Sequence, residues 1–137
     1  MAAAGLMIVY LLAAGIGGAV GAFLRYFAVE ISGKYTKFPA GVLIANIIGT
    51  FLLALTTLYA AKEINGWGGI FEHIELMTFF FNTGVCGSLT TFSTFSYNNL
   101  IYWEEKKYFP LAANILLNII LCTAAVFTAI LLVYYNI

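Results

Sequence analysis

The clearest feature of this 137-residue chain is how little charge it carries. Only 9% of its residues are Asp, Glu, Lys or Arg, whereas 63% are hydrophobic. A soluble domain carries roughly 25% charged residues, so this chain has too few to cover its own surface in water. The composition therefore excludes an ordinary soluble domain and predicts a protein that is solvated by the lipid bilayer.

Acidic residues are absent from the interior of every long apolar run. The six acids lie at the ends of these runs or between them, at Glu30, Glu63, Glu72, Glu75, Glu104 and Glu105. A proton-coupled transporter needs a titratable group within the membrane. This absence argues against a small multidrug-type transporter, which is a four-helix membrane protein and the main alternative function. It also argues against acid–base or metal catalysis, so we expect no enzyme.

Cysteine and histidine are equally scarce. Cys86 and Cys122 both fall within apolar runs, which favours small packing residues over a disulfide or a metal site. The single histidine, His73, lies between two runs, where a solvated or interfacial side chain is the simplest interpretation.

Long apolar runs are what the chain does contain. Each exceeds the roughly 20 residues that a helix needs to cross a bilayer, and they span about 5–29, 39–61, 76–101 and 109–135. Backbone groups in lipid must find partners within their own segment, so such runs form helices. We therefore predict an all-α membrane protein with a single domain, residues 1–137, and four transmembrane helices.

The uncharged polar residues form patterns within these runs. Asn46 and Thr50 are four residues apart, and Asn114, Asn118 and Cys122 repeat at the same spacing, so each set shares a helix face. Interhelical hydrogen bonds that hold a bundle together explain such residues in the simplest way. A second interpretation is that the asparagine N–H groups replace water around an anion, because an amide donates hydrogen bonds without carrying a charge.

Small residues are concentrated in the first run, where Gly17 and Gly21 form a G-x-x-x-G motif. This motif is typical of helices whose backbones pack closely in a membrane.

The segment GVCGSLTTFSTFS, residues 84–96, has two glycines and six hydroxyl side chains but no charge. Gly84 and Gly87 each weaken a helix by about 1 kcal/mol relative to Ala, and Thr90 and Thr91 compete for backbone hydrogen bonds. We therefore predict that the third helix is broken near residues 84–91. Such a break exposes carbonyl oxygens that can coordinate a small cation.

Three segments together suggest a family. GGAVGAFLRY (17–26), GVLIANIIGTFLL (41–53) and GVCGSLTTFSTFS (84–96) closely resemble the Fluc family of fluoride channels, the CrcB-like proteins. The resemblance implies a passive fluoride-selective channel built from four-helix subunits. It also implies that two subunits pair antiparallel as a dual-topology dimer, with two fluoride pores and a central structural sodium ion.

The resemblance assigns roles to matching residues in and near the third run. Phe92 and Phe95 match the paired pore phenylalanines whose ring edges face fluoride, and Asn46 matches the pore asparagine. Ser93 and Thr94 match hydroxyl groups along the ion path.

Further roles follow from the same resemblance. Arg25 matches an arginine near the aqueous vestibule, and Asn114 and Asn118 fall where the family places polar residues of the fourth helix. The backbone carbonyls of Gly87 and Thr90 match the sodium ligands.

Two residues depart from the family pattern. Ser88 stands where a second glycine is usual, and Asn98 stands where a glutamate is common. Any role of that acid is therefore absent or altered in this chain.

The distribution of basic residues bears on topology. The first and third connections carry Lys34, Lys37, Lys106 and Lys107, whereas the second carries only Lys62. By the positive-inside rule this bias favours one orientation, which suits a subunit of a heterodimeric channel. We nevertheless expect a homodimer, because this subunit contains the full set of paired phenylalanines, pore asparagine and sodium-site residues.

Taken together, these features predict a multi-pass protein of the plasma membrane, the inner membrane in a bacterium, that exports fluoride. A purely structural subunit whose polar residues serve packing is the remaining alternative.

Overall fold

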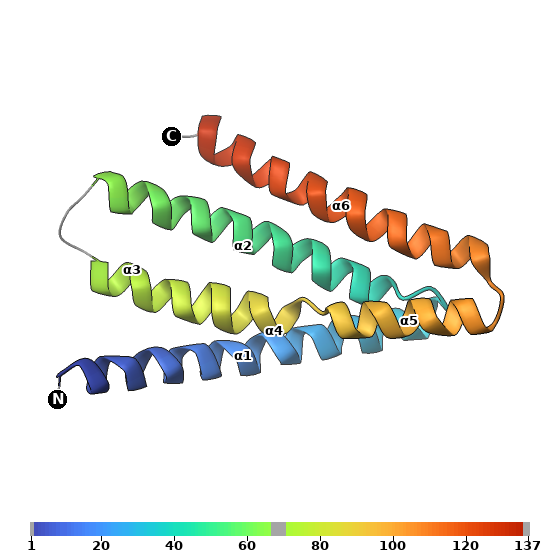
Figure 1. Ribbon diagram of the computed structural model, residues 1–137, viewed down its shortest axis with the longest axis horizontal. Coiled ribbons are helices and arrows are strands. Elements are labelled where there is room, and N and C mark those ends of the chain that lie inside the picture. Colours follow the sequence, from blue (N-terminus) through green and yellow to red (C-terminus); the bar gives the residue numbers. More distant parts are fainter. Residues whose placement is uncertain (1, 67–70, 136–137) are drawn as a thin grey trace.

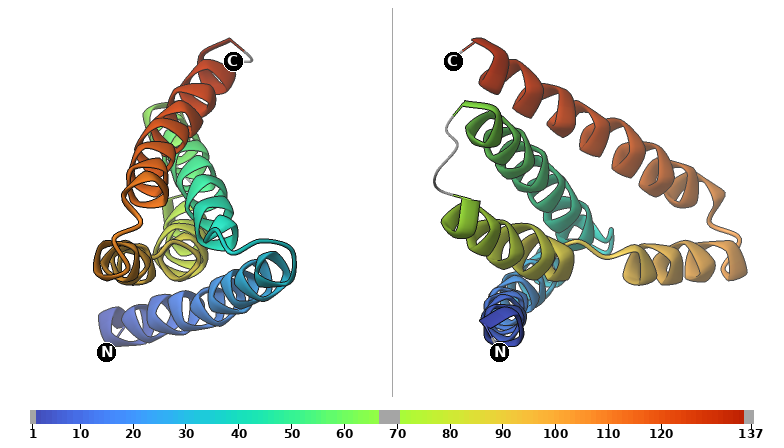
Figure 2. Two further views of the ribbon diagram at one scale, coloured as in Figure 1. Left: turned by 90° about the vertical axis from the view of Figure 1, so that its right-hand side faces the viewer. Right: turned by 60° about the vertical axis from the view of Figure 1, so that its left-hand side comes forward.

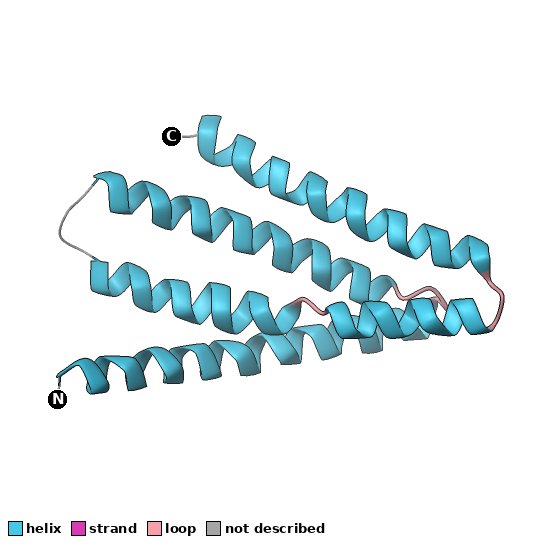
Figure 3. Ribbon diagram, in the orientation of Figure 1, coloured by secondary structure: helices cyan, strands magenta, loops and turns pink. Residues whose placement is uncertain are grey.

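The computed structural model describes residues 2–66 and 71–135, which form helices and short loops only (Figure 3). The long helices are α1 (Ala2–Tyr35), α2 (Ala40–Gly66) and α6 (Tyr108–Tyr135). Between α2 and α6 lie four shorter elements: α3 (Phe71–Thr78), the π-helix η1 (Phe79–Cys86), α4 (Gly87–Leu89) and α5 (Phe92–Glu104). The fold is thus all-helical, as the composition predicts.

Three of these helices are long and apolar enough to cross a membrane. They are Ala4–Tyr35, Ala40–Lys62 and Tyr108–Tyr135. They correspond to the first, second and fourth predicted runs, although α1 continues to Tyr35 instead of ending at residue 29. The third predicted run, 76–101, is divided among α3, η1, α4 and α5 and is not one continuous helix.

The helices are stacked in the order α6, α2, α3 with η1, and α1 (Figure 1). The second view confirms that α1 and α6 lie at opposite edges, and it shows α5 extending away from the other helices (Figure 2). Helix α6 therefore packs along α2 and against α5 instead of closing a compact four-helix bundle.

The closest backbone contact joins α1 to η1 through glycine. A Cβ atom on Gly17 would overlap the Phe80 carbonyl, and one on Gly21 would overlap the Val85 carbonyl. From the other side, a Cβ on Gly84 would lie 2.7 Å from the Ala14 carbonyl oxygen. The packing role predicted for the G-x-x-x-G motif is therefore confirmed.

The buried core is small and composed mostly of small or medium side chains. Its buried hydrophobic members are Val42, Leu43, Ala45, Val85, Cys86, Leu89, Ala125 and Ala129. Large apolar side chains instead point outward along α1, α5 and α6, as in Phe23 and Phe127, each 62% exposed. This outward arrangement suits contact with lipid or with a partner subunit. Cys86, which is 1% exposed, is a packing residue as predicted.

Candidate functional site

The helix break occurs at Thr90 and Thr91, in the gap between α4 and α5. Both residues have extended backbone, with ψ of 148° at Thr90 and φ of −148° at Thr91. Gly84 and Gly87 remain helical, so the predicted break at 84–91 is narrower than expected and the glycines do not cause it. Only the short helix α4 separates the π-helix η1 from this break, and irregular helical turns of this kind often accompany functional sites.

The threonine hydroxyls stabilise the break. The Thr91 side chain caps α5 by accepting a 3.2 Å hydrogen bond from the Thr94 amide. The Thr90 hydroxyl donates to the Cys86 carbonyl at 3.0 Å. These bonds are the competition with helical hydrogen bonding that the sequence suggests.

Asn46 on α2 provides a partner for the backbone at the break. Its Oδ1 accepts a 2.9 Å hydrogen bond from the Thr91 amide, which in a continuous helix would donate to the Gly87 carbonyl. The two segments approach closely because Gly49 lies opposite, where a Cβ would be 2.5 Å from Thr90 Cγ2. Asn46 therefore has its carbonyl oxygen occupied by protein and its Nδ2 group available for other partners.

A chain of four asparagine side chains, Asn46, Asn118, Asn114 and Asn99, continues from this point. Asn46 Nδ2 donates to Asn118 Oδ1 at 3.0 Å, and Asn118 Nδ2 donates to Asn114 Oδ1 at 3.2 Å and to its backbone carbonyl at 2.9 Å. Asn114 Nδ2 then donates to Asn99 Oδ1 at 2.7 Å. We call these residues the asparagine chain; it connects α2, α6 and α5.

Three members of the asparagine chain, Asn46, Asn114 and Asn118, are predicted site residues, whereas Asn99 was not predicted. The spacing of Asn114 and Asn118 reveals their shared face, and both are buried, at 1% and 8% exposure. Asn99 follows another asparagine on α5 and has no periodic partner in the sequence. Only the approach of α5 to α6 shows that it belongs to the chain.

A cavity of about 350 Å³ lies beside the break, and we call it the break pocket. Four predicted pore residues line it, namely Asn46, Phe92, Phe95 and Asn118, together with Thr50, Thr90, Thr91, Ile119 and Cys122. The Phe92 and Phe95 ring centroids are 5.8 Å apart and the rings are tilted by 40°. No acidic side chain lines this pocket, so its polar groups are neutral hydroxyl, thiol and amide groups.

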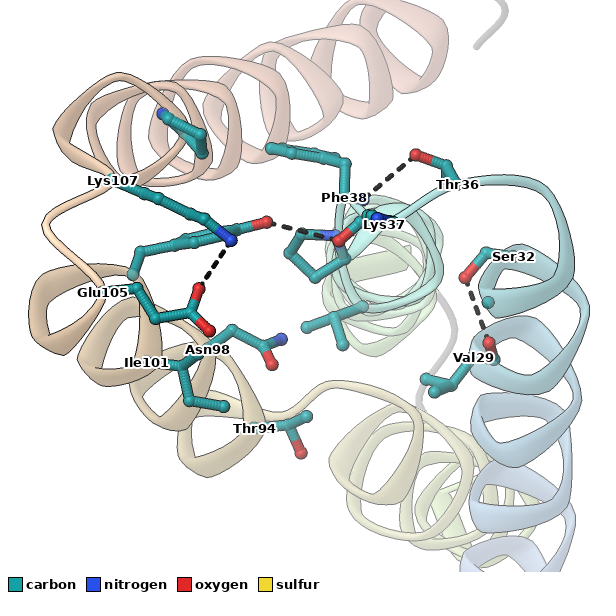
Figure 4. Close-up of a pocket in the computed structure, with 15 residues that line it drawn as sticks. Val29, Ser32, Thr36, Lys37, Phe38, Thr94, Asn98, Ile101, Glu105 and Lys107 are labelled. Carbon is teal, nitrogen blue, oxygen red and sulfur yellow. Dashed lines mark hydrogen bonds and ion pairs between the residues drawn. The ribbon is translucent and has the colours of Figure 1, made fainter.

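A second cavity of about 560 Å³ lies where the α1–α2 and α5–α6 loops meet (Figure 4). Thr94 and Asn98 extend from α5 toward its interior, and Lys37 and Lys107 are also part of its lining. Lys107 forms a 2.7 Å ion pair with Glu105, and this hydrogen bond raises the pKa of the Lys107 ammonium. We call this cavity the loop pocket.

The other predicted site residues lie close to the break or on α1. Ser93 and Thr94 place their hydroxyls 3.2 Å and 3.1 Å from the Thr91 hydroxyl. Gly87 lies on the exposed side of α4. Arg25 is partly buried on α1 and lines neither the break pocket nor the loop pocket.

A separate polar cluster joins α2 to η1. Asn82 donates to the Thr57 hydroxyl at 3.0 Å and accepts a short hydrogen bond from the Thr56 hydroxyl. None of these residues was predicted from the sequence, where Asn82, an Asn within an apolar run, is the signal that could have indicated the cluster. Among the described ranges 2–66 and 71–135, no three His, Cys, Asp or Glu side chains converge as metal ligands.

Comparison with known proteins decides the family. A family model described as CrcB-like protein, Camphor Resistance (CrcB), matches residues 12–130. The chain belongs to this CrcB-like family. Together with the three long apolar helices, membership makes it a multi-pass membrane protein.

Several CrcB-like relatives carry the name fluoride-specific ion channel FluC. The one from Campylobacter lari is 40% identical over 128 residues, covering 92% of this chain and 98% of the relative. One from Campylobacter jejuni is 38% identical over 117 residues, covering 84% and 89%. One from Thermococcus onnurineus is 37% identical over 120 residues, covering 85% and 89%.

Proposed function

We propose that this chain forms a passive, fluoride-selective channel through which fluoride leaves the cytoplasm. Membership of the CrcB-like family and relatives named fluoride-specific ion channels support this channel function, which is not an enzyme activity. In a bacterium such a channel resides in the inner membrane, where the membrane potential drives anions outward.

The orientation of Asn46 is the observation that carries the proposal. Its Oδ1 accepts from the Thr91 amide, so the polar end that it can offer to the break pocket is N–H. A primary amide has two N–H donors, and only one of them is needed for the bond to Asn118. The remaining donor attracts an anion, whereas a free carbonyl oxygen would attract a cation.

The aromatic side chains of the break pocket complement this donor. Phe92 and Phe95 both line it, and the edges of aromatic rings carry positive partial charge. Fluoride is strongly hydrated, so a selective pore replaces its water with several weak donors that still release the ion. The amide N–H groups, the hydroxyls of Ser93 and Thr94, and the ring edges are donors of this kind.

Asn114, Asn118 and Arg25 have supporting roles in this proposal. Asn118 lines the break pocket beside Asn46, and Asn114 is the buried neighbour that binds it. Arg25 contributes positive charge near an aqueous entrance, which raises the local concentration of anions.

We propose that two copies assemble as an antiparallel homodimer. Phe92 is 80% exposed although it lines the break pocket, so the pocket is open on the side where a second subunit would complete it. The lysine bias of the connecting loops favours the alternative of a heterodimer with a subunit of fixed opposite orientation. Tag accessibility on both faces of the membrane, measured with this chain expressed alone, distinguishes the two assemblies.

We also propose a structural sodium ion at the subunit interface, held by the backbone carbonyls of Gly87 and Thr90. In a continuous helix the Thr91 and Thr94 amides would bond these carbonyls, but here they donate to Asn46 and to the Thr91 hydroxyl. Carbonyl oxygens without their helical donors suit a hard monovalent cation.

Efflux from liposomes tests the proposed function. Vesicles that contain the protein and are loaded with fluoride should release it far faster than empty vesicles, as followed with a fluoride electrode. Equal release of chloride in parallel vesicles would contradict selectivity, and no release of either ion would contradict the channel itself.

A further inference from the structure

The asparagine chain has a fixed polarity. Thr91 offers a backbone N–H, which can only donate, so Asn46 must turn Oδ1 toward it and Nδ2 toward Asn118. Asn118 must then accept with Oδ1 and donate onward with Nδ2 to Asn114. One backbone amide at the helix break therefore sets the direction of every amide that follows.

The same polarity requires an acceptor at the far end of the chain. Asn114 donates its Nδ2 to Asn99 Oδ1 at 2.7 Å, the shortest bond in the chain. Asn114 is only 1% exposed, so water does not readily replace Asn99 as its partner. A buried donor without an acceptor is destabilised by about 1–3 kcal/mol, so Asn114 would turn to find another partner.

A turn of Asn114 would be transmitted toward the break pocket. Asn118 Nδ2 would lose the 3.2 Å bond to Asn114 Oδ1 but keep the 2.9 Å bond to the Asn114 backbone carbonyl. Asn118 would thus be loosened and not released. Asn118 Oδ1 accepts from Asn46 Nδ2, so the position of the N–H that Asn46 directs into the break pocket would become less well defined.

We infer that Asn99 is a positioning residue for the ion path. By accepting from Asn114, it restrains Asn114 and Asn118 and so fixes the position of the Asn46 N–H that the Thr91 amide already turns toward the break pocket. This inference rests on the proposed anion function, because it assigns Asn99 to the same site although Asn99 lies outside the pocket lining.

Asn82 offers a matched control for this inference. It is also an interhelical asparagine with two side-chain hydrogen bonds, to Thr56 and Thr57 of α2. These threonines lie about 15 Å along α2 from Asn46, as ten residues of helix span this length. Asn82→Leu therefore removes a comparable interhelical contact without touching the asparagine chain.

The experiment compares Asn99→Leu, Asn99→Asp and Asn82→Leu in liposomes and by NMR of ¹⁵N-asparagine-labelled dimer. Asn99→Leu should shift the Asn46 side-chain amide resonances and lower the ratio of fluoride to chloride efflux by about ten-fold. Asn82→Leu should lower the unfolding temperature while leaving the efflux ratio and the Asn46 resonances at wild-type values. Asn99→Asp retains an acceptor for Asn114 and should keep the Asn46 resonances in place.

The outcomes separate this inference from the proposed function. Wild-type Asn46 resonances and a wild-type efflux ratio in folded Asn99→Leu protein would overturn the inference, as would equal effects of Asn99→Leu and Asn82→Leu. If Asn99→Leu does not fold, displaced Asn46 resonances in Asn99→Asp would also overturn it. Failure of the wild-type protein to conduct fluoride contradicts the proposed function alone, because the resonances still report on the asparagine chain.

Discussion

The Thr91 amide donates a 2.9 Å hydrogen bond to Asn46 Oδ1, across 45 residues of sequence. This bond fills the gap that the helix break leaves in the backbone hydrogen bonding of the third segment. It also fixes which end of the Asn46 amide faces the break pocket, so the break and the anion donor belong to one structural unit.

Replacing Asn46 by Asp tests the need for that donor. The carboxylate of Asn46→Asp still accepts from Thr91 but presents negative charge to the break pocket in place of N–H. Two like charges 4 Å apart repel by about 4 kcal/mol at an effective dielectric constant near 20. We therefore expect fluoride efflux to fall more than about hundred-fold in protein that still folds, measured in liposomes. Wild-type efflux from this variant would contradict the assignment of Asn46.

Replacing Phe92 or Phe95 by Ile tests the role of the rings. Phe92 is 80% exposed in the subunit, so Phe92→Ile should alter thermal unfolding of the subunit very little. Isoleucine has no positive ring edge, and we expect conduction to be lost. Phe127→Ile is the matched control, since Phe127 is 62% exposed on α6 and lines neither pocket. Similar efflux from all three variants would favour a structural role for these residues.

Replacing Gly21 by Ala tests the contact between α1 and η1. The new Cβ would overlap the Val85 carbonyl, and overpacking of this kind costs about 1–3 kcal/mol. We expect a lower unfolding temperature in detergent. Gly15→Ala serves as the control, because a Cβ at Gly15 has no neighbour within 4 Å and should leave the unfolding temperature unchanged or slightly higher. Equal stability of both variants would contradict the packing described for α1.

Removing sodium tests the proposed cation site. With sodium replaced by a large organic cation, the Gly87 and Thr90 carbonyls of the two subunits would face one another without a ligand. We expect slower fluoride efflux and a larger fraction of monomer in native mass spectra. Restoring sodium should reverse both effects. Identical efflux and dimer content in the two buffers would count against a structural sodium ion.

The long helices and the close packing at glycine could be predicted from the sequence, because apolar length and glycine spacing are local features. Hydropathy alone predicted the apolar runs that form α1, α2 and α6. The spacing of Gly17 and Gly21 predicted their close approach to a neighbouring helix. The hydroxyls of Thr90 and Thr91 predicted the break, whereas Gly84 and Gly87, which also suggested it, stay helical within η1 and α4.

The hydrogen bonds between the asparagines could not be predicted from the sequence, because they depend on how helices distant in sequence approach one another. Asn46 and Asn118 are 72 residues apart, and no local pattern links them. Asn99 joins them only because α5 packs against α6, which in turn packs along α2. Asn82 belongs to a different cluster for the same reason, although it is the same residue type.

The reversal potential in a planar bilayer measures fluoride selectivity most directly. With a fluoride gradient in one direction and a chloride gradient in the other, at constant sodium, we predict a current that reverses at the fluoride equilibrium potential. Reversal at the chloride potential, or midway between the two, would contradict an ion path in which neutral N–H, O–H and ring-edge donors select fluoride.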